Sequence, residues 1–144
     1  MTEYGKVYDA FLVRILEDDW DGIFTEEIEQ DWRLLLEAAI PWFKFPRIDL
    51  ERNDEGFVNT LGSEEIQIIA TYMKCEWLNR TILTWENIKP LYNERDFSQA
   101  NLLDKLQNTL KAERERAEQL EAIYYRSRKG KPFNFASLAT KIGN

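Results

Sequence analysis

Apolar residues recur at helical spacing along most of the chain, and segment 63–83 shows the most informative pattern. Its apolar residues form two stripes on opposite sides of a helix: Ile66, Ile69, Ala70, Met73 and Trp77 on one, and Ile68, Tyr72, Cys75, Leu78 and Ile82 on the other. A helix with one apolar stripe lies on a surface, whereas a helix with two opposed stripes is packed between neighbours. The pattern therefore predicts that 63–83 is the buried centre of a helical domain.

Two shorter segments that precede it are also predicted to be helical. The first covers 3–17, where apolar residues follow the i, i+3, i+4, i+7 pattern and Thr2 is placed to cap the helix. The second begins after Thr25 and ends near Pro41. Because the connection between them is short, we expect an antiparallel pair.

The segment 42–61 has a different pattern. Apolar and charged residues alternate on both sides of Asn53-Asp54-Glu55-Gly56, which is a turn signal. A small β-hairpin or an extended excursion is predicted here. After the central helix, 84–92 is predicted to be a separate short helix, capped by Thr84 and ended near Pro90.

The last predicted helix covers 99–126 and is roughly 42 Å long. A coiled-coil-like seam runs along it: Leu103, Leu106, Leu110, Glu113, Ala117, Leu120 and Tyr124. The whole pattern predicts a mainly α fold, a bundle of four to five helices around 63–83. We expect 1–126 to form one helical domain and 127–144 to be an extended basic tail.

Composition supports one folded domain and shows an uneven charge. The chain has 144 residues, 44% of them hydrophobic, and a net charge of −7. Segment 1–62 holds 15 acidic and 6 basic residues, whereas 126–144 holds 5 basic residues and no acidic one. A basic tail on an acidic body lacks the broad positive surface that nucleic-acid binding needs. Docking of the tail on a protein, including another copy of this chain, is the better hypothesis.

Few residues are available for catalysis or metal binding. The chain has no histidine and one cysteine, Cys75, which lies on an apolar stripe and is predicted to be a buried structural thiol rather than a reactive one. An EF-hand alignment that starts at Glu17 places Ile28 where a bidentate carboxylate is required. Capping and dipole roles account for the paired carboxylates Glu64/Glu65, Asp18/Asp19 and Glu94/Asp96. We therefore expect no enzyme, no cofactor and no metal site.

Aromatic residues outside the predicted helix seams are candidates for protein contacts. The following aromatic residues lie in loops or flexible stretches, where they serve either as satellite core or as interface anchors: Trp20, Trp42, Phe43, Trp85, Phe133 and Phe135. The charged middle of the long helix and the tail are the other candidates. The predicted interface residues are Glu113, Arg114, Arg116, Glu118, Arg128, Lys129, Lys131, Phe133 and Phe135.

The order of these elements resembles a known class of protein. Two short helices precede a Pro-flanked hairpin region, then the buried helix SEEIQIIATYMKCEWL, a turn from Tyr92 to Asp96-Phe97-Ser98, and a long charged helix. This arrangement is similar to the head–tail connector (adaptor or neck) proteins of tailed bacteriophages that infect Gram-positive hosts. The resemblance implies a helical fold without catalysis.

The resemblance also implies a place in the virion. Such proteins are made in the host cytoplasm and form rings of copies of themselves, commonly twelve-fold, between the portal protein and the next neck or tail protein. The DNA passes through the ring without specific binding, and no membrane is involved. The alternative function is that of a small acidic helical regulator that binds one host or phage protein. A ring and a monomeric or dimeric regulator differ in mass.

Overall fold

The computed structural model describes residues 1–16, 32–88 and 97–126. The helices within these ranges are α1 (Tyr4–Leu16), α3 (Trp32–Ala39), the 3-10 helix η2 (Ile40–Trp42), α4 (Ser63–Ile88) and α5 (Phe97–Arg126). Two short strands, β1 (Thr2–Glu3) and β2 (Gly56–Phe57), form a small antiparallel sheet. The fold is mainly α, with a long C-terminal helix, as the sequence pattern predicts.

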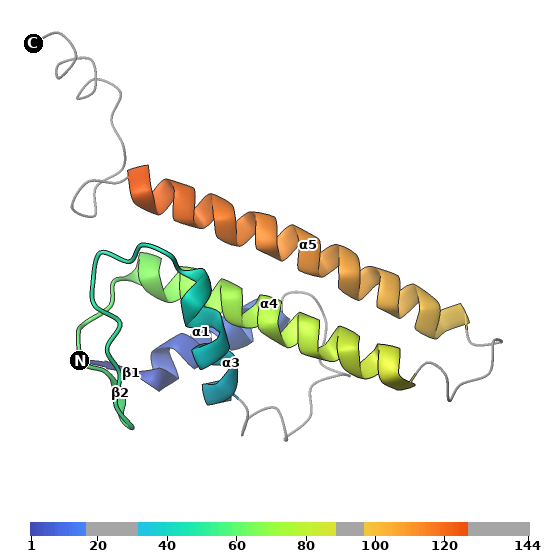
Figure 1. The fold of residues 1–144 in the computed structure, drawn as a ribbon, viewed down its shortest axis with the longest axis horizontal. Coiled ribbons are helices and arrows are strands. Elements are labelled where there is room, and N and C mark those ends of the chain that lie inside the picture. The colour runs from blue at the N-terminus through green and yellow to red at the C-terminus, as the bar shows by residue number, and fades with distance from the viewer. Residues whose placement is uncertain (17–31, 89–96, 127–144) are drawn as a thin grey trace, which may run out of the picture.

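Helix α4 lies at the centre of this arrangement. Helices α1 and α3 pack on one side of it, and α5 runs antiparallel to it along the other (Figure 1). Both predicted stripes are covered as a result: Met73 and Trp77 of the first, and Leu78 of the second, are almost completely buried. The prediction that 63–83 is packed between neighbours is confirmed.

The prediction of a separate helix over 84–92 is wrong for its first half, because α4 continues without a break to Ile88. Thr84 does not cap a new helix. Its hydroxyl donates a hydrogen bond to the carbonyl oxygen of Arg80 at 2.9 Å, one turn back in the same helix. Thr81 bonds to Trp77 in the same way. A threonine that is satisfied by the i−4 carbonyl group is compatible with a helix interior. Residues 89–92 lie outside the described ranges.

The expected capping of α1 by Thr2 is also wrong. Thr2 lies in β1, and its hydroxyl oxygen accepts a hydrogen bond from the backbone N–H of Leu61 at 2.8 Å. The side chain is buried, so this bond satisfies a polar group inside the protein. The predicted cap at Thr25 lies outside the described residues.

The turn predicted at 53–56 is present, and it forms part of a minimal hairpin. The N–H of Asn53 donates to the carbonyl oxygen of Gly56 at 2.9 Å, and Arg52 and Phe57 form an isolated bridge. The partner of β2, however, is the N-terminal strand: Thr2 pairs with Phe57 and Glu3 pairs with Gly56. A contact over such a separation leaves no local signal in the sequence, and the pattern did not predict it.

Substituting Gly56 with alanine is expected to destabilise this sheet. An added Cβ atom at Gly56 would lie 2.2 Å from the carbonyl oxygen of Thr2, which is backbone and cannot rotate away. The clash should separate β1 from β2 and lower the melting temperature of the full chain. Alanine at Gly5, where nothing lies within 4 Å of the added Cβ atom, is the matched control and should be neutral or stabilising. Equal melting temperatures for the two variants would contradict the predicted clash.

Candidate functional site

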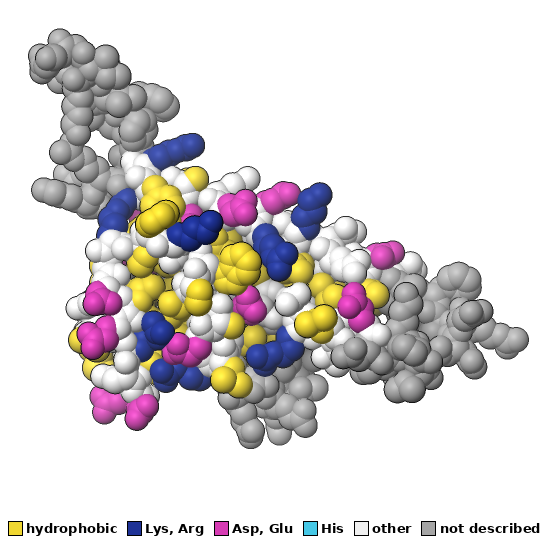
Figure 2. All heavy atoms as spheres, viewed as in Figure 1, with side chains coloured by type: hydrophobic (Ala, Val, Ile, Leu, Met, Phe, Trp, Pro, Cys, Tyr) yellow, Lys and Arg dark blue, Asp and Glu magenta, His cyan; other side chains and the backbone are white. Residues whose placement is uncertain are grey.

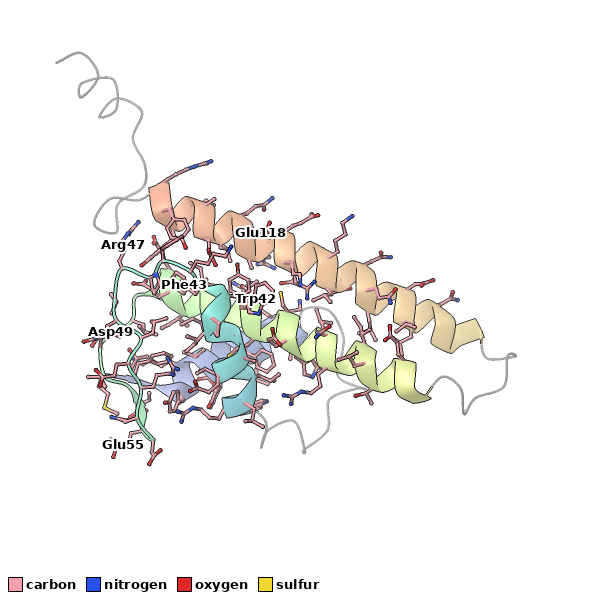
Figure 3. All side chains as sticks on the ribbon, viewed as in Figure 1. Trp42, Phe43, Arg47, Asp49, Glu55 and Glu118 are labelled. Atoms are coloured by element: carbon pink, nitrogen blue, oxygen red, sulfur yellow. The ribbon has the colours of Figure 1, made fainter. Side chains whose placement is uncertain are left out.

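The segment that follows η2 is fixed against the C-terminal end of α5. Phe43 is buried, and its ring meets the ring of Tyr124 edge-on at 5.4 Å. The backbone N–H of Arg47 donates to the hydroxyl of Tyr124 at 2.8 Å, and the guanidinium group of Arg47 lies 4.2 Å from the centre of the same ring. Arg47 also donates to the backbone carbonyl of Tyr124. These contacts hold 43–47 in one conformation beside the helix (Figure 3).

This arrangement leaves three large aromatic side chains exposed along one side of α5: Trp42, Phe45 and Tyr125, with 47%, 70% and 41% of their surface accessible. We call them the aromatic strip. The rings of Phe45 and Tyr125 are 6.1 Å apart, and the N–H of Phe45 donates to the Tyr125 hydroxyl at 3.1 Å. Trp42 stacks on Tyr72 of α4, with ring centres 6.2 Å apart. Figure 2 shows hydrophobic side chains along the α4–α5 junction, with charged side chains around them.

Charged groups of both signs surround the strip. The indole N–H of Trp42 donates to a carboxylate oxygen of Glu76 at 2.8 Å, and the guanidinium group of Arg114 lies 5.9 Å from the centre of the Trp42 ring. Glu121 accepts a hydrogen bond from the Tyr125 hydroxyl at 2.9 Å. Glu118, one turn before Glu121 on α5, is exposed (Figure 3). Trp, Tyr and Arg are the residue types that dominate the binding energy of protein interfaces.

The tyrosine hydroxyls at this site remain protonated. Burial raises the pKa of Tyr72, with the nearby carboxylate of Glu121 as the second cause. Burial and the Glu121 carboxylate raise the pKa of Tyr125 in the same way. Both hydroxyls therefore act as hydrogen-bond donors at neutral pH, a role that suits recognition better than proton transfer.

The predicted interface residues on α5 divide into two groups. Arg114, Arg116 and Glu118 are exposed, and their interface role stays a prediction. Glu113 lies instead in the contact between α4 and α5, where 7% of its surface is accessible. Its carboxylate is 3.1 Å from the ammonium group of Lys74. This ion pair is a contact within the chain, and an interface role for Glu113 stays a prediction. The predicted tail residues Arg128, Lys129, Lys131, Phe133 and Phe135 lie outside the described ranges.

Of the three candidate carboxylate pairs, the structure describes one, Glu64/Glu65. Glu64 and Glu65 lie in the first turn of α4, where the helix dipole favours negative charge, and Glu65 is buried. The pairs Asp18/Asp19 and Glu94/Asp96, and the aligned calcium loop, lie outside the described residues. Among the residues that are described, no group of three His, Cys, Asp or Glu side chains is arranged to hold a metal ion.

A shallow depression of about 650 Å³ is bounded by η2 and the segment that leads to β2. Its lining includes Asp49 and Glu51, and the carboxylate of Asp49 accepts a hydrogen bond from the backbone N–H of Glu51 at 3.0 Å. This bond forms a local turn rather than a pair of facing acids. The depression is open to solvent and does not exclude water from a substrate.

The thiol of Cys75 is expected to be unreactive in the folded protein. The side chain is buried, and burial raises the pKa of the Cys75 thiol to about 12. At pH 8 roughly one thiol in ten thousand is then ionised, and the thiolate is the reactive form. Labelling with a thiol-specific disulfide reagent should be negligible in native buffer and complete in denaturant. Fast labelling without denaturant would contradict the structural role of Cys75.

Comparisons with protein-family models, with curated proteins and with solved structures find no match for this chain. In the ranges that the structure describes, no helix has both the length and the hydrophobicity needed to cross a bilayer.

Sequence reasoning identified Trp42 as a contact candidate but missed Phe45 and Tyr125. The sequence did not decide whether the adjacent residues Trp42 and Phe43 belong to the core or to a contact surface. In the structure Phe43 is buried in the core and Trp42 is exposed. A signal for Tyr125 was present: adjacent residues on a helix point about 100° apart, so the pair Tyr124-Tyr125 cannot be buried in one seam. The structure does not describe the side chains of the other four candidates, Trp20, Trp85, Phe133 and Phe135.

Proposed function

We propose that this protein is a structural subunit of the bacteriophage neck, where it forms a ring between the portal and the tail and extends the DNA channel. The aromatic strip of Trp42, Phe45 and Tyr125 carries the proposal. Its rings are exposed, yet hydrogen bonds and ring contacts already hold them in place. A preorganised aromatic surface loses little conformational entropy on binding, which is the property of an interface anchor.

The rest of the described surface is consistent with an assembly role. A ring uses heterologous contacts, so every subunit needs two different surfaces. The aromatic strip supplies one, and the exposed charges of α5, Arg116 among them, or the basic tail supply the other. The net charge of −7 suits a channel through which DNA slides without binding. The resemblance in element order supplies the phage class and the twelve-fold ring.

The mass of the assembled protein tests this proposal. We expect light scattering and electron microscopy of the purified full chain, alone and with the portal protein, to show rings of many 17.1 kDa subunits with a central channel. A protein that stays monomeric or dimeric in both conditions would contradict the ring. If that small species instead bound a single host or phage protein, the result would favour the acidic regulator.

A further inference from the structure

Three acidic side chains border the aromatic strip: Glu76, Glu118 and Glu121. The guanidinium group of Arg114 lies over the ring of Trp42. The guanidinium group of Arg47 lies over the ring of Tyr124 and donates to the backbone carbonyl of the same residue. A ligand for this surface should therefore combine apolar or aromatic groups with positive charge.

Glu121 gives the most specific indication of a basic ligand. Its side chain is buried, with 7% of the residue surface accessible. One carboxylate oxygen accepts the Tyr125 hydroxyl, and the Tyr72 hydroxyl is a neighbour of the same carboxylate. Among the described residues, no ion pair of Glu121 is present. Hydroxyl donors leave the negative charge of the carboxylate in place, so a lysine or arginine that docks beside it would be attracted to it.

The chain itself contains a segment with this chemistry. Residues 127–144 include four basic residues and no acidic one, and they also include Phe133, Phe135 and Leu138. The segment is 18 residues long and follows directly from Arg126, the last residue of α5 and the neighbour of Tyr125. Its charge and its aromatic content both complement the strip.

The direction of α5 favours the strip of a neighbouring copy over the strip of the same chain. Trp42 lies beside Arg114, roughly 16 Å back along α5 from Tyr125, whereas α5 carries the chain forward at Arg126. The chain's own segment would have to reverse its direction to reach Trp42. In a head-to-tail arrangement, the segment of one subunit continues onto the next, and donor and acceptor are different surfaces.

We propose that residues 127–144 of one copy dock on the aromatic strip of a neighbouring copy, with Phe133 and Phe135 against Trp42 and Phe45 and the basic residues beside Glu118 and Glu121. This inference rests on the proposed self-assembly and identifies a contact between neighbouring subunits of the ring. Because the contact includes charge pairs, it should weaken as the salt concentration rises.

Complementation between two full-length variants tests the docking. The acceptor variant carries Trp42→Ala and Phe45→Ala, the donor variant carries Phe133→Ala and Phe135→Ala, and Leu83→Ala, also at an exposed residue, is the control. Analytical ultracentrifugation should show each double variant associating roughly 30-fold or more weakly than the unaltered chain. An equimolar mixture should recover 1:1 heterodimers, since one intact donor still meets one intact acceptor. The control should assemble normally, and circular dichroism should show that every variant is folded.

Photo-cross-linking provides a readout that does not depend on stable assembly. A photoreactive phenylalanine at position 45, mixed at high concentration with ¹⁵N-labelled full chain, should cross-link to labelled peptides from 127–144. Cross-links only to the unlabelled segment of the same molecule would show that the segment covers its own strip, and would overturn the proposal. Rings formed by both double variants would also overturn it, while leaving the ring function itself intact.

Discussion

Replacing Lys74 with methionine is expected to destabilise the protein by about 3 kcal/mol, and replacing Glu113 with leucine by up to about 5 kcal/mol. The two charges lie 3.1 Å apart, with 1% of the Lys74 side chain and 9% of the Glu113 side chain accessible. Removal of either partner leaves the other charge buried in the contact between α4 and α5. The lysine variant should lose less, because Arg116 lies 3.9 Å from Glu113 and can compensate in part.

The double variant Lys74→Met/Glu113→Leu should be far milder than either single one. Apolar residues of similar volume fill the same space without a charge to desolvate, so we expect a stability within about 1 kcal/mol of the unaltered chain, or above it. Urea unfolding followed by circular dichroism gives all four values, provided that the slope of the transition is unchanged. Additive losses in the double variant would show that the two side chains do not interact.

The buried pair also suggests why α5 packs in one register. On the other side of α4, Arg14 of α1 donates to the side chain of Gln67, so the contacts of α4 with α5 and with α1 each contain a polar bridge. An apolar seam such as that of Leu106, Leu110 and Ala117 tolerates sliding, whereas a buried charge is satisfied in one alignment. In the double variant, although it is stable, we expect α5 to pack on α4 in more than one alignment. Hydrogen exchange would detect this as reduced protection of the backbone amides of α5.

Replacing Trp77 with alanine is expected to cost about 3–5 kcal/mol, the range for a large buried aromatic side chain. Trp77 is 2% exposed and is the largest fully buried side chain among the described residues. Its removal leaves a cavity between α4 and the helices packed on it, which the surrounding rigid helices fill only in part. The full chain should melt at a clearly lower temperature.

Trp42→Ala is the matched control for this experiment. Trp42 is half exposed, and it loses one stacked ring contact and one hydrogen bond, so about 1 kcal/mol is expected. The two tryptophans should therefore separate folding from association: Trp77→Ala reduces stability, while Trp42→Ala mainly reduces binding. A greater loss of stability at Trp42 than at Trp77 would place Trp42 in the core.

Several local features could be predicted from the sequence because periodicity and turn chemistry encode them. The stripes of 63–83, the seam of the last helix and the turn at Asn53–Gly56 are examples. The boundary at Thr84 was predicted wrongly, because the same hydroxyl can cap a new helix or bond to the preceding turn. Local residue type does not decide between these two outcomes.

The candidate site was predictable only in part. Arg114 and Glu118 were identified from the charged face of the last helix, and Trp42 from its position in a loop. The strip itself depends on the packing of 43–47 against Tyr124 and Tyr125, about 80 residues further along the chain. When two segments so far apart in sequence pack together, no local pattern indicates which of their aromatic side chains stay exposed to solvent.

The sequence by itself determined the helical class, the burial of the central helix and the acidic balance of the chain, because side-chain periodicity and charge are properties of the linear order. Only the tertiary structure decided that Glu113 pairs with Lys74 inside the protein, that β2 pairs with the N-terminal strand, and that Trp42, Phe45 and Tyr125 share one surface. Each of these contacts joins residues far apart in sequence. Their partners are selected by the geometry of packed helices, in which a residue's environment depends on which neighbour faces it.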